Sequence, residues 1–113
     1  MIISTHPFGS QMCGILKKKE KINCKLATIL TDFHIHGQWL VFNEYCDYYF
    51  VSNDQMKSDM ITYGIAENKI NVTGIPVSDR FKNIENKEEI YKEFDLDPDK
   101  QVVLFFAGGE FAL

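Results

Sequence analysis

The side chains best suited to chemistry gather in one short segment, residues 31–39 (TDFHIHGQW). It holds the carboxylate of Asp32, the imidazoles of His34 and His36, and the indole of Trp39. A carboxylate and an imidazole beside an aromatic wall suit recognition of a sugar or a polar head group. We interpret His36 as functional, His34 as a surface residue and Trp39 as a wall shared by core and site, whereas Asp32 could equally cap a turn.

A metal site is the alternative interpretation of the same residues. Asp32, His34 and His36 form an Asp-x-His-x-His pattern, and in an extended run both imidazoles face one side. His6 could supply a fourth ligand from a neighbouring strand. This alternative predicts a metal-assisted hydrolase with an open coordination position.

Two other polar segments, 4–7 (STHP) and 107–111 (AGGEF), also follow strand-like runs. Ligands of open parallel α/β sheets bind beyond the carboxyl ends of the strands, so all three segments are candidates. Gly108 and Gly109 would let backbone amides approach a phosphate at the start of a helix. Glu110 would repel that phosphate unless it points away or binds a sugar hydroxyl.

Strands are needed to bring these segments together, and strand-like and helix-like patterns alternate along the chain. The alternation predicts βα units and a parallel sheet, which is an α/β, Rossmann-like fold. Residues 26–31 (LATILT) are apolar on both faces, as buried parallel strands are. Strands are predicted at residues 1–5, 26–31, 48–52, 69–73 and 101–106.

The first predicted helix follows Pro7, a residue that suits the first turn of a helix. Three lysines, 17–19, occupy its last turns, where the helix dipole favours cations. Together with Lys21 they would suit contact with anionic lipid head groups, although such a helix end is also typical of a solvated surface. The apolar stripe of this helix is Phe8, Met12, Ile15 and Leu16.

Two further helices carry sequence signals for their ends. Ser52 with Gln55 forms a plausible capping box, and Gly64 lies where a helix end favours a left-handed residue. Asn86 with Glu89 indicates the start of the last helix.

The composition of the 113 residues excludes several classes of protein. Apolar residues make up 45% and charged residues 25%, which excludes a disordered tail, a collagen-like fibre and a disulfide scaffold. There is no run of 18 apolar residues and no signal-peptide pattern at the start. The net charge of −4 gives no reason to expect nucleic acid as a partner. The three cysteines lack a CxxC spacing, which favours reduced, buried thiols.

Five motifs follow one another in a fixed order along the chain. They are THPF (5–8), TDFHIHGQW (31–39), DYY (47–49), VTGIPV (72–77) and VVL (102–104) before the glycine pair. This series resembles the monogalactosyldiacylglycerol synthases and processive diacylglycerol glucosyltransferases, a family related to the bacterial cell-wall glycosyltransferase MurG. The resemblance runs from about Ile3 to Gly109, and its most specific parts are the TDxxxHxxW segment and the TGIPV turn.

The resemblance implies a GT-B architecture, in which two Rossmann-like domains face each other across a cleft. The activity it implies is transfer of a hexose from a UDP-sugar to diacylglycerol or a glycolipid, with no metal and no cofactor. It also implies a cytoplasmic protein that is peripheral at the inner face of the membrane. On this basis residues 1–76 are the back of the acceptor domain, 77–100 a linker with a helix, and 101–113 the start of the nucleotide-sugar (donor) domain.

Residue roles carry over from the same resemblance. Gly108 and Gly109 fall on the turn that faces the nucleotide sugar, although Ala107 replaces the first glycine of the family's usual run of three. The acceptor site would be shaped by His6, Asp32, His36 and Trp39.

The resemblance also implies that the general base lies in a glycine-rich loop that would precede Met1. We therefore expect the chain to be a piece of a longer enzyme and to be inactive alone. The alternative from another class is a non-catalytic module that binds lipid or a partner.

Overall fold

A computed structural model of the chain describes residues 1–82 and 86–105. The chain divides into two compact units, Met1–Pro76 and Val77–Leu113. Each unit is described by itself below.

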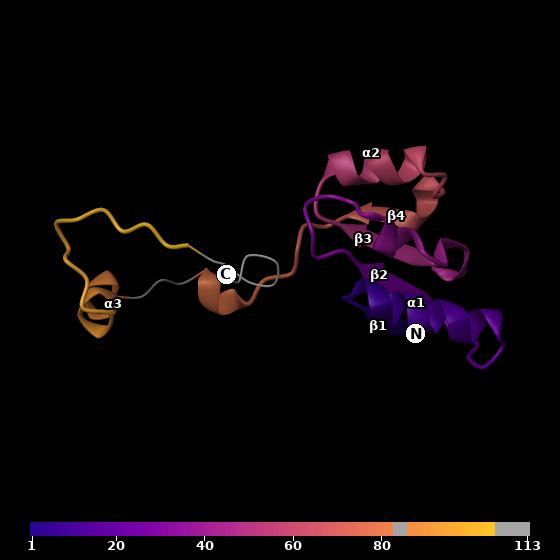
Figure 1. Cartoon of the computed structure of the whole chain (residues 1–113), viewed down its shortest axis with the longest axis horizontal. Helices are drawn as coiled ribbons and strands as arrows, with labels where there is room; N and C mark the ends of the chain where they lie inside the picture. Colours follow the sequence, from indigo (N-terminus) through magenta and orange to yellow (C-terminus); the bar gives the residue numbers. More distant parts are fainter. Residues whose placement is uncertain (83–85, 106–113) are drawn as a thin grey trace. The chain divides into compact units, whose positions relative to one another are not determined.

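The first unit contains a parallel sheet of four strands in the order β1-β2-β3-β4 (Figure 1). All three strand pairs are parallel, which confirms the predicted α/β fold. The strand bounds are β1 Ile2–Ser4, β2 Leu26–Ile29, β3 Tyr48–Val51 and β4 Ile70–Val72.

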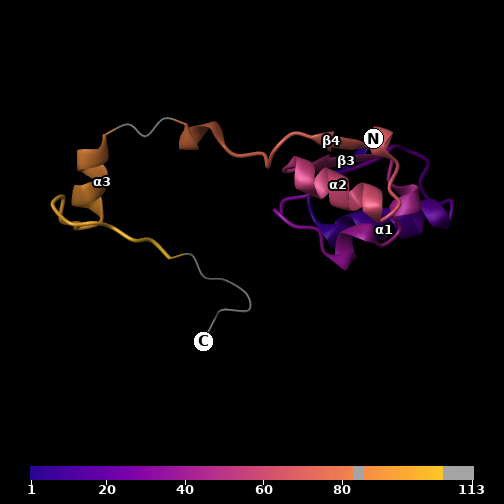
Figure 2. The ribbon, with the colours of Figure 1, turned by 90° about the horizontal axis from the view of Figure 1, so that it is seen from above.

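Helix α1 (Pro7–Lys18) connects β1 to β2, and α2 (Asp54–Thr62) connects β3 to β4. The link from β2 to β3 is a long loop with two short 3-10 helices, η1 (Gly37–Leu40) and η2 (Asn43–Tyr45). Both α-helices lie on the same side of the sheet (Figure 2). This is the result of making each crossover right-handed while the strands advance in one direction.

The hydrophobic core lies between the sheet and these helices. Tyr49 and Ile70, which are register partners on the covered face, pack with Met56 and Met60 of α2. Cys13 of α1 packs against the same cluster. The other buried members are Leu26, Leu30, Trp39, Cys46, Val51 and Ile65.

The opposite face of the sheet is apolar and open to solvent. Ile3 and Tyr48 flank Ala27 in one register row, and Ile29 pairs with Phe50 in the next. Ile3 is 56% exposed and Tyr48 is 40% exposed. Parallel sheets are usually covered on both faces, so this first unit leaves one face without its usual layer.

Helix α1 turns small residues toward the rest of the unit and places its largest apolar side chains outside. Ser10 and Gly14 are buried, whereas Phe8 is 62% and Met12 57% exposed. The buried Ser10 hydroxyl meets the hydroxyl of Thr28 in β2 at 2.7 Å, which satisfies both groups. The predicted stripe is therefore helical, but two of its members do not face the core.

Helix α2 begins one residue later than the capping-box prediction requires. Its N-cap is Asn53, whose side-chain oxygen accepts from the Met56 amide at 2.9 Å. The predicted cap, Ser52, instead contacts the Met56 sulfur at 2.9 Å. Gly64 has φ +86°, the left-handed conformation expected after the helix end.

The second unit contains α3 (Lys87–Glu93) and a 3-10 turn, η4 (Asp79–Phe81). Helix α3 begins directly after Asn86, as predicted, but Asn86 lies in the left-handed region and its side chain makes no cap hydrogen bond. The strand predicted over 101–106 is also not formed over its described part, 101–105. A strand needs a neighbour for its backbone hydrogen bonds, and no strand pairs with this stretch among the described residues.

In the described part of the chain, no helix combines the length and the apolar character that crossing a bilayer requires.

Candidate functional site

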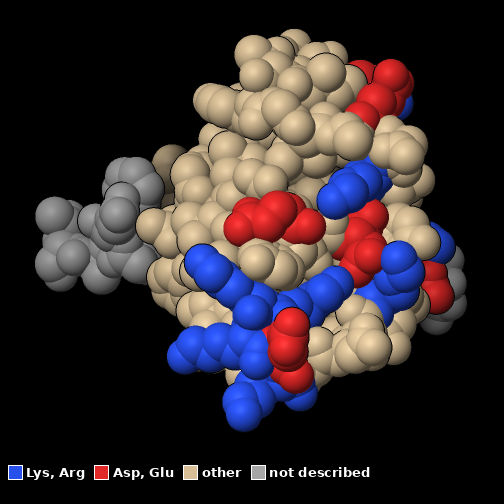
Figure 3. All heavy atoms as spheres, turned by 90° about the vertical axis from the view of Figure 1, so that its right-hand side faces the viewer, with Lys and Arg blue, Asp and Glu red and all other residues tan. Residues whose placement is uncertain are grey.

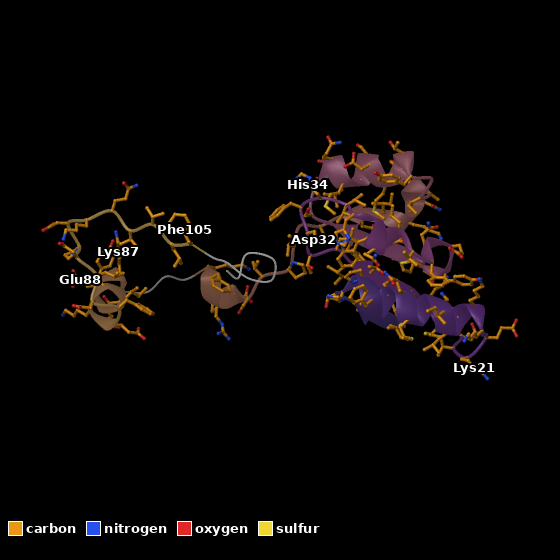
Figure 4. All side chains as sticks on the ribbon, viewed as in Figure 1. Lys21, Asp32, His34, Lys87, Glu88 and Phe105 are labelled. Atoms are coloured by element: carbon orange, nitrogen blue, oxygen red, sulfur yellow. The ribbon has the colours of Figure 1, made fainter. Side chains whose placement is uncertain are left out.

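Three of the predicted site residues meet at the carboxyl edge of the sheet, just beyond β2. Asp32 Oδ2 accepts a hydrogen bond from Trp39 Nε1 at 2.6 Å and lies 3.1 Å from His36 Nε2. The rings of His36 and Trp39 are tilted at 47° with centroids 5.9 Å apart. Figure 4 shows Asp32 and His34 at this end of the first unit. The structure therefore brings Asp32, His36 and Trp39 together.

The burial of the three side chains differs in a way that suits a site. Trp39 is 2% exposed and belongs to the core, while the side chains of Asp32 and His36 are about half exposed. Both contacts of Asp32 use Oδ2, so Oδ1 can accept a hydrogen bond from a ligand. When His36 donates from Nε2 in its neutral form, its Nδ1 is an acceptor as well. The cluster can thus orient hydroxyl groups.

A tight turn after His36 produces this geometry. The backbone of His36 is extended, and η1 begins at the next residue, with the Trp39 amide donating to the His36 carbonyl at 3.0 Å. The turn places Trp39 over Asp32. Gln11 of α1 holds the turn from outside, since its side-chain amide donates to the Gln38 carbonyl at 2.7 Å.

His6 has a structural role at the start of α1. It follows β1 and is the N-cap of α1, where Nδ1 accepts from the Phe8 amide at 3.3 Å. Its ring also packs against Phe8, with the centroids 5.1 Å apart. Within the residues the structure describes, no hydrogen bond or ion pair joins His6 to Asp32 or His36. His6 thus caps α1, and its role in the acceptor site stays a prediction.

The metal alternative lacks the geometry it needs. Over residues 1–82 and 86–105, no three side chains of His, Cys, Asp or Glu are grouped closely enough to hold a metal ion. His34 is exposed, while His36 is engaged with Asp32. The Asp-x-His-x-His spacing therefore places two imidazoles near one carboxylate in sequence but does not form a three-ligand site.

The lysines of α1 lie at the other end of the first unit. Figure 4 shows Lys21 at the end opposite Asp32, and Figure 3 shows lysine side chains gathered there. Lys17 and Lys25 each contact Asp47 at 2.7 Å, through different oxygens. Burial raises the pKa of Asp47, but the hydrogen bonds from the two lysines and from the Leu26 amide outweigh it and hold the pKa well below its usual range. This ion pair joins α1 to the amino edge of the sheet.

Phe42 of the loop between β2 and β3 packs on Gly14 of α1, and the sequence signal for this contact is weak. Phe42 adopts a left-handed conformation, which its residue type does not favour. Gly14 offered a hint, since an isolated glycine within a helical pattern often has a packing reason. The predicted nucleotide-sugar residues Gly108 and Gly109 lie outside the described residues.

Comparison with known proteins gives a consistent result. A family model described as monogalactosyldiacylglycerol (MGDG) synthase matches residues 1–77. Processive diacylglycerol beta-glucosyltransferases from Staphylococcus aureus strains JH9, Newman and USA300 are each 34% identical to the chain over 101 residues. These matches cover 89% of the chain and 25% of each relative. The chain thus spans about a quarter of the length of these relatives. No solved structure gives a significant match.

Proposed function

Because this chain belongs to the monogalactosyldiacylglycerol synthase family, we propose that it is part of a glycosyltransferase that moves a hexose from a UDP-sugar to diacylglycerol. The family match supports the reaction class. The observation that carries the role of this chain is the Asp32–His36–Trp39 cluster beyond β2. A half-exposed carboxylate and imidazole against a buried indole suit a hydroxyl-bearing head group.

The proposed task of the cluster is to orient the acceptor. Oδ1 of Asp32 accepts a hydrogen bond from the acceptor hydroxyl, and His36 offers a second polar contact on the same side. Trp39 is almost fully buried and offers the ligand little surface, but it holds Asp32 in one orientation through the 2.6 Å bond. Such positioning lowers the entropic cost of bringing two substrates together.

Proton transfer is assigned to a group outside this chain. A general base must lie within hydrogen-bond reach of the acceptor hydroxyl and must be free to take its proton. The family resemblance puts that base in a glycine-rich loop that would precede Met1, while Asp32 orients the hydroxyl through Oδ1. We therefore expect the chain by itself to bind acceptor lipid without transferring sugar.

The domain assignment follows from the family. Residues 1–76 form the back of the acceptor domain of a GT-B enzyme, 77–100 a linker with a helix, and 101–113 the start of the donor domain. Gly108 and Gly109 would then face the UDP-sugar. The compact unit that ends at Pro76 supports the first part of this assignment.

The membrane is proposed as a partner of the acceptor side, with the protein peripheral at the inner face. Phe8 and Met12, both exposed on α1, could enter the lipid surface. The lysines at the far end of α1 would add attraction to anionic lipids of about 1 kcal/mol for each cation near the surface.

The function is tested by binding to vesicles of phosphatidylcholine prepared with and without diacylglycerol. We expect the chain to prefer the vesicles that contain diacylglycerol, and His36→Ala to weaken that preference about tenfold, as loss of a hydrogen bond to a charged or polar partner does. His34→Ala is the matched control, since His34 is an exposed imidazole in the same loop.

Equal binding of both vesicle types would reject the acceptor-site proposal. Sugar transfer from UDP-glucose by the chain alone would reject the assignment of the base to another segment. Binding of diacylglycerol without transfer in every longer form of the protein would favour a non-catalytic lipid-binding module.

A further inference from the structure

The loop that carries the site is fastened to α1 by a second contact, between Phe42 and Gly14. Phe42 lies between η1 and η2 with φ +61° and ψ +31°. A bulky residue in this left-handed region is a true outlier, and such a conformation persists only where the surroundings enforce it. The contacts of Phe42 with its surroundings must therefore enforce this conformation.

Gly14 provides the space into which Phe42 packs. A Cβ atom at position 14 would lie 2.6 Å from the Cβ and 3.2 Å from the Cγ of Phe42. Real Cβ atoms do not approach so closely, so any other residue in this buried turn of α1 would push Phe42 away. The contact accounts for a glycine in the middle of a helix, where it is otherwise unfavourable.

The side chains of Lys18 and Tyr45 also contact the Phe42 ring. The Lys18 ammonium lies 5.8 Å from the ring centroid on the α1 side. On the loop side, the Tyr45 ring is 6.5 Å away, and the Tyr45 amide donates to the Phe42 carbonyl at 3.0 Å. Helix α1 thus holds the ring of Phe42, and the backbone of Phe42 leads directly into η2.

The part of the loop between its two contacts with α1 contains Trp39 of the candidate site. Gln11 holds Gln38 in η1, and Gly14 holds Phe42. Trp39 lies between these points, and its indole must reach Asp32 to within 2.6 Å. The geometry points to Gly14 and Phe42 as positioning residues that set the register of the loop on α1 so that Trp39 meets Asp32. Only the identity of the ligand rests on the proposed function; the positioning does not.

Hydrogen exchange of backbone amides in the full chain tests this role. The reporters are the Trp39 and Tyr45 amides, which donate to the His36 and Phe42 carbonyls within the loop. The reference is the Leu30 amide, which donates to Phe50 in the sheet. We expect Gly14→Ala to speed exchange of the reporters about tenfold relative to the reference, because overpacking favours the detached loop. Acrylamide quenching of Trp39, the single tryptophan, should rise in parallel.

Gly37→Ala is the matched control, because it adds the same methyl group within the loop but into open space. It should leave the reporters unchanged. A general loss of stability in Gly14→Ala would speed the Leu30 amide equally, and that result would overturn the positioning role.

The Phe42→Gly variant distinguishes the effect of the Phe42–Gly14 contact from the effect of the backbone strain at position 42. Glycine relieves the left-handed conformation, so a residue that only stored strain would leave a tighter loop and slower exchange. A positioning residue would leave a looser loop and faster exchange. In the Phe42→Gly background, Gly14→Ala should have no further effect, since the clash is gone. Slower exchange in Phe42→Gly, or additive effects, would refute the proposal.

The vesicle experiment keeps the two proposals apart. Faster exchange together with weaker binding to diacylglycerol vesicles supports both. Faster exchange in a protein that never distinguishes the vesicles supports the positioning role and rejects the acceptor site.

Discussion

Asp32 engages its structural partners through one carboxylate oxygen and leaves the other for a ligand. Its Oδ2 satisfies the buried indole of Trp39, which would otherwise lack an acceptor in the core. The same oxygen holds His36 at the surface. The structural and functional interpretations of Asp32 are therefore compatible, because the two oxygens of the group can take different partners.

Asp47 has the clearest effect of pH on the first unit. Its pKa is lower in the folded chain than the ordinary value of 3.8, so the unfolded chain takes up a proton first as the pH falls. The contribution of Asp47 to the free energy of unfolding is thus complete above that value and is lost as the pH falls through the lower, folded pKa.

We predict that Asp47→Asn lowers the free energy of unfolding at about pH 7, and that the difference from the unmodified chain shrinks below about pH 4. Urea unfolding followed across this range by circular dichroism measures the effect. Glu67→Gln is the control, because exposed Glu67 also has a lowered pKa, through Lys57, but its ion pair is screened by solvent. A constant deficit at every pH would contradict the prediction.

At the scale of elements, the start of α2 distinguishes a sequence signal from the cap that forms. Ser52 and Asn53 are both good N-cap residue types, so the sequence allows either. The helix begins after Asn53 because its side chain reaches the Met56 amide, while Ser52 is still in the turn that leaves β3.

We predict that Asn53→Ala costs about 1 kcal/mol in the free energy of unfolding. Ser52→Ala should cost clearly less, since the Ser52 hydroxyl caps no backbone amide of α2. Thermal and urea unfolding of the two variants provide the comparison. The reverse order of costs would show that the helix starts at the earlier residue in solution.

At the scale of the whole molecule, the first unit is a two-layer structure with one bare sheet face. Ile3 and Tyr48 lie on that face, and Ile70 lies on the covered one. Exposed apolar surface of this kind binds hydrophobic dyes and promotes association.

We predict that the double substitution Ile3→Thr and Tyr48→Thr reduces dye binding and self-association while changing the free energy of unfolding by only about 0.5 kcal/mol. Threonine keeps the β-propensity of the strands. Ile70→Thr, on the covered face, should cost about 2 kcal/mol or more. Light scattering and urea unfolding test both statements, and equal costs for the two faces would show that the open face is covered in solution.

Much of the fold could be predicted because it depends on local patterns. The alternation of strand and helix signals, Pro7 at a helix start and Gly64 after a helix end all depend on residues close in sequence. The strand expected at 101–106 failed for the opposite reason, since its apolar composition is local but a strand requires a partner.

The sequence by itself determined the parallel α/β fold, the family and the segment that carries the candidate site. The tertiary structure decided which contacts the residues in and around that segment make. His6 caps α1, Asp32 joins Trp39 to His36, and Phe42 packs on Gly14. These roles depend on which atoms come within a few ångströms after the chain has folded. Side-chain type and spacing limit those contacts but do not choose among them, because packing between distant segments sets the final distances.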